Sequence, residues 1–114
     1  MSGKLVRKFD GPEGQVIELA IGPPVPDQND WRCDVCIDGK LRYAMGVDAV
    51  QAMWLALCLA ATELYTSAPY VAGELSWLGG ADLGLPIPEV IRDDVAEDMK
   101  LAEELLATRQ RGGR

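Results

Sequence analysis

Hydrophobic and polar residues alternate along the first part of the chain, a pattern typical of strands that bury one face. Residues 4–9 and 15–22 both follow it, and the turn-forming segment 10–14 separates them. The sequence therefore predicts an antiparallel hairpin in this region. The apolar positions of its second strand are Ile17, Leu19 and Ile21.

The same alternation returns after a segment rich in proline. Residues 22–30 contain three prolines, which lack a backbone donor and restrict the residue before them, so we expect a loop without strand pairing there. Beyond this loop, apolar residues occupy every second position on both sides of Asp38-Gly39, and this predicts a second hairpin. The apolar positions are Trp31, Cys33, Val35 and Ile37 before the turn and Leu41, Tyr43 and Met45 after it.

The length of the turn at Asp38-Gly39 decides which face of the sheet each strand buries. A two-residue turn would pair Ile37 with Lys40 and place the two apolar sets on opposite faces. A three-residue connection instead pairs Ile37 with Leu41 and places both sets on one face. We therefore expect a three-residue or bulged turn.

A helix is predicted around the longest apolar run of the chain, which is unbroken from Ala52 to Ala61. Asp48, followed by Gln51 three residues later, matches a capping pattern, so the helix is expected to begin at Asp48 and to end near Thr66, before Ala68-Pro69. A membrane-spanning helix needs about 20 apolar residues, which excludes a membrane span for this run.

Apolar side chains surround the axis of this central helix, so we expect it to be covered on more than one side. The sheet would cover one side and a second helix the other, which would bury Trp54, Leu55 and Leu59. The second helix is predicted from Glu89 to Ala107, with an apolar stripe at intervals of three or four residues. The stripe consists of Ile91, Val95, Met99, Ala102 and Leu106.

These elements predict an α+β fold: an antiparallel four- to five-stranded sheet, made of two hairpins plus a short strand, packed on a buried central helix, with an amphipathic C-terminal helix. The short strand is expected within residues 73–80, and residues 81–88 are expected to form a loop rich in glycine and proline. Residues 1–108 are predicted to form one domain, and residues 109–114 a basic flexible tail.

Eighteen acidic residues against eleven basic ones give a net charge of −7. This sign argues against nucleic acid and anionic membranes as partners and favours a basic protein. The N-terminal residues lack the apolar segment of a secretory signal, and an odd number of cysteines is untypical of disulfide-stapled secreted domains. We therefore expect a cytoplasmic protein with free thiols.

The residue types needed for common enzyme chemistry are scarce. The chain has no histidine, the commonest general base and catalytic zinc ligand. Cys33 and Cys36 have CxxC spacing, but residues three apart on a strand point to opposite faces and cannot share a metal ion or a disulfide. We expect no catalytic residue, no metal and no cofactor.

An acidic cluster and two tryptophans are the candidate contact residues for a partner. Asp94, Glu97 and Asp98 share one helical face, and Asp93 precedes them. A solvated helix face is the first interpretation of this cluster, a docking surface for a basic protein the second, and a catalytic role the third. Trp31 and Trp77 lie at strand ends, where a ring can be half-buried and contact a partner, whereas Trp54 is expected in the core.

The order of several motifs resembles a family of small bacterial proteins of unknown function. The motifs are the W-x-C-x-V-x-I strand of residues 31–37, the DxxQA helix start at Asp48, the L-x-W of residues 75–77 and the L-G-L-P of residues 83–86. The resemblance covers about residues 30 to 88 and implies the order of the elements. It implies no activity, catalytic residue or cofactor.

Three functions are compatible with these observations. The first is a non-catalytic protein-binding module, most concretely an inhibitor of the immunity-protein or antitoxin type that binds a basic toxin or enzyme. The second is a small adaptor or regulatory subunit that acts through oligomerisation, by a sheet edge or a helix face. The third is a small-ligand binder with a pocket between sheet and helix, lined by Tyr43, Trp31 and Trp77. The sequence does not set the oligomeric state.

Overall fold

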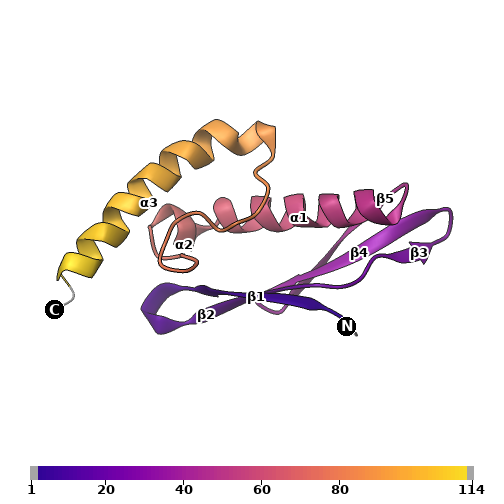
Figure 1. The fold of residues 1–114 in the computed structure, drawn as a ribbon, viewed down its shortest axis with the longest axis horizontal. Helices are drawn as coiled ribbons and strands as arrows, with labels where there is room; N and C mark the ends of the chain where they lie inside the picture. Colours follow the sequence, from indigo (N-terminus) through magenta and orange to yellow (C-terminus); the bar gives the residue numbers. More distant parts are fainter. Residues whose placement is uncertain (1–2, 113–114) are drawn as a thin grey trace.

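The computed structural model describes residues 3–112 and shows an antiparallel sheet with all three α-helices on one of its faces (Figure 1). This confirms the predicted α+β class. In chain order the elements are β1 (Leu5–Asp10), η1 (Pro12–Gly14), β2 (Val16–Ile21), β3 (Val25–Asp27), β4 (Asp30–Ile37), β5 (Lys40–Gly46), α1 (Ala49–Tyr65), α2 (Ala68–Val71), η2 (Glu89–Ile91) and α3 (Arg92–Gly112).

Strand β4 is the centre of the sheet. One of its edges pairs with β5, and the other is shared between β2 and the short β3. Strand β1 pairs with β2 as the predicted first hairpin and forms the other end of the sheet. The face that α1 covers carries the core residues of the strands, and no helix of the described chain covers the opposite face, here called the outer face (Figure 1).

The turn between β4 and β5 has two residues, so the prediction of a three-residue or bulged turn is wrong. Asp38 and Gly39 have φ angles of 48° and 83°, the left-handed pair that a tight hairpin turn requires because it matches the strand twist. Ile37 therefore pairs with Lys40. The apolar residues of β4 and β5 therefore lie on opposite faces of the sheet. Those of β5 lie on the outer face, and its charged residues face α1.

The prediction that residues 22–30 form no strand is also wrong. Val25–Asp27 pairs with β4, and Pro26 lies opposite Trp31. A proline is tolerated there because β3 is an edge strand and its other side needs no donor. The strand expected within residues 73–80 is reduced to two isolated bridges, Asp10↔Ser76 and Trp77↔Gly80, so β3 is the fifth strand.

Helix α1 begins as predicted. The Asp48 carboxylate accepts a hydrogen bond from the Gln51 backbone N–H at 2.8 Å, and the Gln51 side chain accepts one from the Val47 N–H at 2.8 Å. These contacts satisfy two backbone donors at the start of the helix. The helix ends at Tyr65, with Thr66 as its C-cap.

The expectation that α1 is covered on nearly every side is wrong. Its face toward the sheet consists of small residues, Ala52, Ala56 and Ala60, which are completely buried. Trp54, expected in the core, is 56% exposed, Leu55 is 39% exposed and Leu59 is only partly buried. Helix α3 packs mainly against α2 and diverges from α1 (Figure 1), so it leaves the outer side of α1 open. No helix within residues 3–112 combines the length and the apolar character needed to cross a bilayer.

Helix α3 confirms the predicted amphipathic pattern. Val95 and Ala102 are buried on the predicted stripe, and the other stripe positions are partly buried. The helix continues to Gly112, so the part of the predicted flexible tail from residue 109 to residue 112 is helical. Residues 113–114 lie outside the described part of the chain.

Candidate functional site

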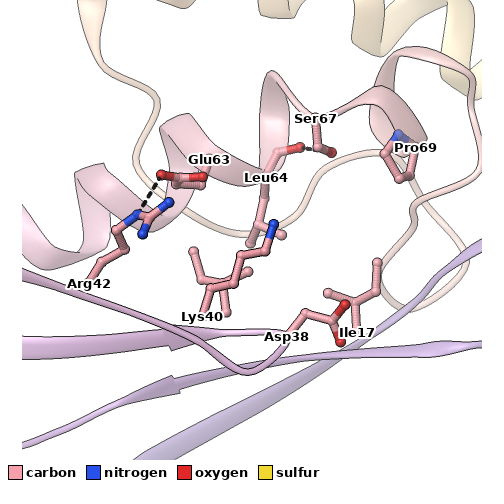
Figure 2. A pocket seen from close by; sticks show the side chains of 9 residues that line it. Ile17, Asp38, Lys40, Arg42, Glu63, Leu64, Ser67 and Pro69 are labelled. Carbon is pink, nitrogen blue, oxygen red and sulfur yellow. Dashed lines mark hydrogen bonds and ion pairs between the residues drawn. The ribbon is translucent and has the colours of Figure 1, made fainter.

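A hollow of about 230 Å³ lies between the β4–β5 turn and the C-terminal end of α1 (Figure 2). Its position follows from the two-residue turn, which directs alternate side chains of β5 toward α1. Apolar side chains form part of its wall, and five polar or charged side chains complete it. The lining residues are Ile17, Ile37, Asp38, Lys40, Arg42, Glu63, Leu64, Ser67 and Pro69.

The charged groups of the hollow come from opposite sides. Arg42 of β5 donates through Nε to the Glu63 carboxylate of α1 at 3.3 Å, and both side chains are more than a third exposed, so this ion pair contributes little stability. Lys40 extends into the hollow between Leu64 and Asp38 (Figure 2). Within the described part of the chain its ammonium group forms no ion pair.

This arrangement can offer a carboxylate attached to an apolar group two cations, Lys40 and Arg42, beside the two carboxylates, Asp38 and Glu63, that also line the hollow. The Lys40 ammonium and the terminal nitrogens of Arg42 supply donors, and the Leu64 side chain supplies an apolar wall. The sequence did not mark Lys40, Arg42 or Glu63 as site residues, because the predicted turn places the β5 cations on the outer face.

A second hollow lies between β1 and the loop that follows α2, and Arg7, one of its lining residues, holds Trp77. The Arg7 guanidinium stacks on the Trp77 ring at 3.9 Å and donates to the carbonyl oxygens of Leu83 and Gly84, each at 3.0 Å. Trp77 is therefore half-buried, as predicted, and it is engaged by its own chain.

Two buried tyrosines fasten the same loop. The Tyr65 hydroxyl accepts from the Leu83 N–H at 2.8 Å, and the Tyr70 hydroxyl donates to the Ala81 carbonyl at 2.8 Å. The two rings meet edge to face at 5.0 Å. Burial raises the pKa of both phenols above their ordinary value, so both hydroxyls keep their protons. Their role is structural, and no pattern in the sequence pointed to it.

The predicted acidic cluster lies on the first turns of α3. Asp93, Asp94 and Glu97 are exposed, and Asp98 is partly buried toward Tyr70, where its charge adds to the burial that raises the phenol pKa. Leu101, four residues after Glu97, extends the same face and is 52% exposed. Within the described residues, no group of three or more Cys, Asp or Glu side chains is placed to hold a metal ion.

The structure does not bring the candidate contact residues together. Trp31 is half-buried in β4, opposite Pro26 and Gly46, whereas Trp77 packs on Arg7. The expected ligand pocket lined by Tyr43, Trp31 and Trp77 does not form. Tyr43 lies on the outer face, where the Arg32 guanidinium stacks over its ring at 4.2 Å. Trp31 packs against the core from β4, and Trp77 stacks on Arg7 of β1 from the loop after α2.

The cysteines confirm the predicted alternation along β4. Cys33 is completely buried under α1, and Cys36 points to the outer face, opposite Leu41. The Cys33 thiol donates to the Gly22 carbonyl at 3.3 Å, and burial, together with the charge of Asp34, raises its pKa. It therefore stays protonated in the core.

Comparison with known proteins places the chain in a family. No curated protein and no solved structure matches it. One family model, described as a domain of unknown function (DUF6968), matches residues 5–87. The match spans the whole sheet, α1, α2 and the loop fastened by the tyrosines, and it ends before η2 and the acidic helix α3. Because this is most of the chain, the protein belongs to the DUF6968 family.

Proposed function

We propose that this chain is a non-catalytic protein-binding module of the cytoplasm, most concretely an inhibitor of the immunity-protein or antitoxin type, which docks on a basic partner. The observation that carries the proposal is the exposed face of α3. It combines the carboxylates of Asp94 and Glu97 with the half-exposed side chain of Leu101, on a helix that diverges from the rest of the domain (Figure 1).

The two kinds of side chain on this face would act at different stages of binding. Carboxylates of an acidic protein accelerate the approach of a cationic partner over distances of about 10 Å at ordinary salt. An exposed leucine beside them gains free energy when it is removed from water, which slows dissociation. The acidic face would therefore increase the association rate, and Leu101 would lengthen the lifetime of the complex.

The test begins with the full chain, tagged and purified from its native host, and identifies a stoichiometric partner. Binding of that partner is then measured by biolayer interferometry at low and high salt. The double variant Asp94→Lys with Glu97→Lys is expected to lower the association rate by about tenfold or more and to weaken its salt dependence. The matched control is Glu13→Lys with Glu18→Lys, two exposed charge reversals in the β1–β2 hairpin that change the net charge by the same amount, and it should leave both quantities unchanged.

Two results would contradict the proposal. A partner that is acidic, or whose association rate does not depend on salt, would remove the electrostatic argument. A basic partner that binds the double variant as fast as the wild type would show that α3 is not the docking face.

The hollow of Figure 2 favours a second candidate function, the binding of a small carboxylate. A thermal-shift screen with aliphatic and aromatic carboxylates should then raise the melting temperature of the wild type. The same ligands should have no effect on Lys40→Ala. Equal shifts in both proteins would exclude binding at this hollow.

A further inference from the structure

The outer edge of β5 is open, and the hydrogen bonds of β4 show which backbone groups it exposes. The Asp34 carbonyl accepts from the Gly22 N–H at 2.9 Å, and the Asp38 N–H donates to the Glu18 carbonyl at 2.9 Å. The even-numbered residues of β4 therefore direct their backbone groups away from β5, and the odd-numbered residues bond to it.

The partners of those odd-numbered residues are the even-numbered residues of β5, from Lys40, opposite Ile37, to Gly46, opposite Trp31. The residues between them turn their N–H and C=O groups toward the free edge. No strand or loop of the described chain pairs with this edge. The residues with free backbone groups are Leu41, Tyr43 and Met45.

The same three residues expose large apolar side chains on the outer face. Leu41 is 59% exposed, Tyr43 55% and Met45 36%. Natural edge strands are usually blunted by proline, by a bulge, by a covering segment or by charged side chains. Within Lys40–Gly46, β5 has no proline, bulge or covering segment, and its two charges, Lys40 and Arg42, lie on the face toward α1, so the outer face of this edge carries no charge from β5. At the opposite edge, the last residue of β1 is paired, since Asp10 exchanges two backbone hydrogen bonds with Ser76.

We propose that β5 pairs antiparallel with β5 of a second copy of this chain, so that two sheets become one continuous sheet across a two-fold axis at Tyr43. In this register Tyr43 lies opposite Tyr43 of the second copy, and Leu41 lies opposite its Met45. All three free residues then exchange backbone hydrogen bonds, and the outer face gains a row of apolar cross-strand pairs.

The charges of β5 favour this register over its neighbours. They also favour a second copy of the chain as the partner of this edge. With the axis at Tyr43, Arg42 lies opposite Ala44 and Lys40 opposite Gly46, so no like charges lie directly opposite each other, and the two Arg42 side chains are diagonal neighbours. An axis at Arg42 would oppose two guanidinium groups. An axis at Ala44 would leave Leu41 opposite Val47, which lies beyond the end of the strand. The sequence of β5 is thus complementary to itself in one register.

Helix α1 adds a second layer to the same interface. It packs on β4 and β5, and the Glu63 carboxylate reaches Arg42 of β5, which shows which flank of the helix faces the open edge. Leu59 and Leu55 lie one and two turns earlier on that flank. Leu55 is 39% exposed and Leu59 partly buried, so in the dimer these leucines would face those of the second copy across the two-fold axis.

The first test measures mass. Size-exclusion chromatography with light scattering should show twice the 12.4 kDa of one chain at concentrations of about 0.1–1 mM, since an interface this small binds weakly. Tyr43→Lys places two ammonium groups opposite each other and should raise the dissociation constant by about tenfold or more. Val6→Lys adds the same charge to the outer face at β1 and should leave the dimer unchanged. A wild type that stays at 12.4 kDa at about 1 mM overturns the proposal.

The second test fixes the register by disulfide trapping, with the two partly exposed thiols Cys36 and Cys58 replaced by serine. Tyr43→Cys should cross-link under mild oxidation, because directly opposite residues are about 5.5 Å apart between Cα atoms, within the range of a disulfide. Leu41→Cys is the control, because two such residues would lie about 13 Å apart along the strands. A dimer that traps equally through both positions, or through neither, uses another surface and refutes the proposal.

This inference is independent of the proposed docking of a basic partner on α3. The two sets of variants change different elements, and the dimer test needs no partner. Failure of the dimer would leave the α3 experiment unaffected, and failure of the α3 experiment would leave the dimer standing.

Discussion

Replacement of Gly46 by alanine tests the closest approach in the fold, between the end of β5 and the start of α1. A Cβ atom at Gly46 would lie 2.4 Å from the backbone nitrogen of Ala52 and 2.8 Å from the carbonyl carbon of Gln51. Both are backbone atoms and cannot rotate away. The first turn of α1 would have to retreat by about 1 Å to restore an ordinary contact, which would loosen the packing of its small buried residues on the sheet.

The expected cost of Gly46→Ala is about 2–3 kcal/mol in the free energy of unfolding, the upper part of the range for overpacking, because the obstacle is backbone. For a domain of this size that corresponds to a fall in Tm of roughly 8–12 °C. Urea denaturation followed by tryptophan fluorescence measures the free energy, and calorimetry measures the Tm.

The matched control for this prediction is Gly80→Ala. A Cβ atom there would be 3.5 Å from its nearest neighbour, a side-chain oxygen of Glu103, so the variant should lie within about 1 kcal/mol of the wild type, since the added methyl group only restricts the unfolded chain. If Gly46→Ala were as stable as Gly80→Ala, the close contact between β5 and α1 would not exist and the position of α1 over the sheet would be wrong.

Three further substitutions test other contacts. Tyr65→Phe removes the acceptor of the buried Leu83 N–H and should cost about 1–3 kcal/mol in denaturant unfolding; no loss would mean that the loop after α2 is held by other contacts. Asp48→Ala removes the cap on the Gln51 N–H and should lower the unfolding free energy by about 1 kcal/mol, with less helical circular dichroism at the midpoint of the wild type. Trp54→Gln should cost less than about 1 kcal/mol because the ring is largely exposed, whereas a loss near the 3–5 kcal/mol of a buried tryptophan would contradict that exposure.

The hollow lined by Lys40 and Arg42 could not be predicted from the sequence, for a physical reason. Lys40 and Arg42 alternate with the apolar residues of β5, and a change of one residue in the turn exchanges the two sets between the faces of the sheet. The three-residue turn was predicted because it would bury the apolar residues of β5. The two positive φ angles at Asp38-Gly39 fix the other register, which directs the cations toward Glu63 and leaves the apolar set exposed on the outer face.

The exposure of α1 has a similar origin. A helix that is apolar on every side indicates burial on every side only if other elements are available to cover it. Here the alanines that recur at Ala52, Ala56 and Ala60 select the face of closest packing, and the large side chains remain on the flanks and top. The acidic cluster of α3, by contrast, was found from spacing alone, because an exposed helix face depends on local periodicity and on no distant contact.

The sequence by itself determined the position and type of most elements: two hairpins, a capped central helix and an amphipathic C-terminal helix. These follow from periodicity and capping, which act over a few residues. Only the tertiary structure decided which face each strand buries, that a proline-containing segment completes the sheet as β3, and that α3 leaves α1 and the edge of β5 uncovered. Those outcomes depend on turn geometry and on the packing of segments far apart in the chain. A register shift of one residue exchanges the two faces of a strand, and a helix that packs elsewhere leaves the side chains beneath it exposed to water.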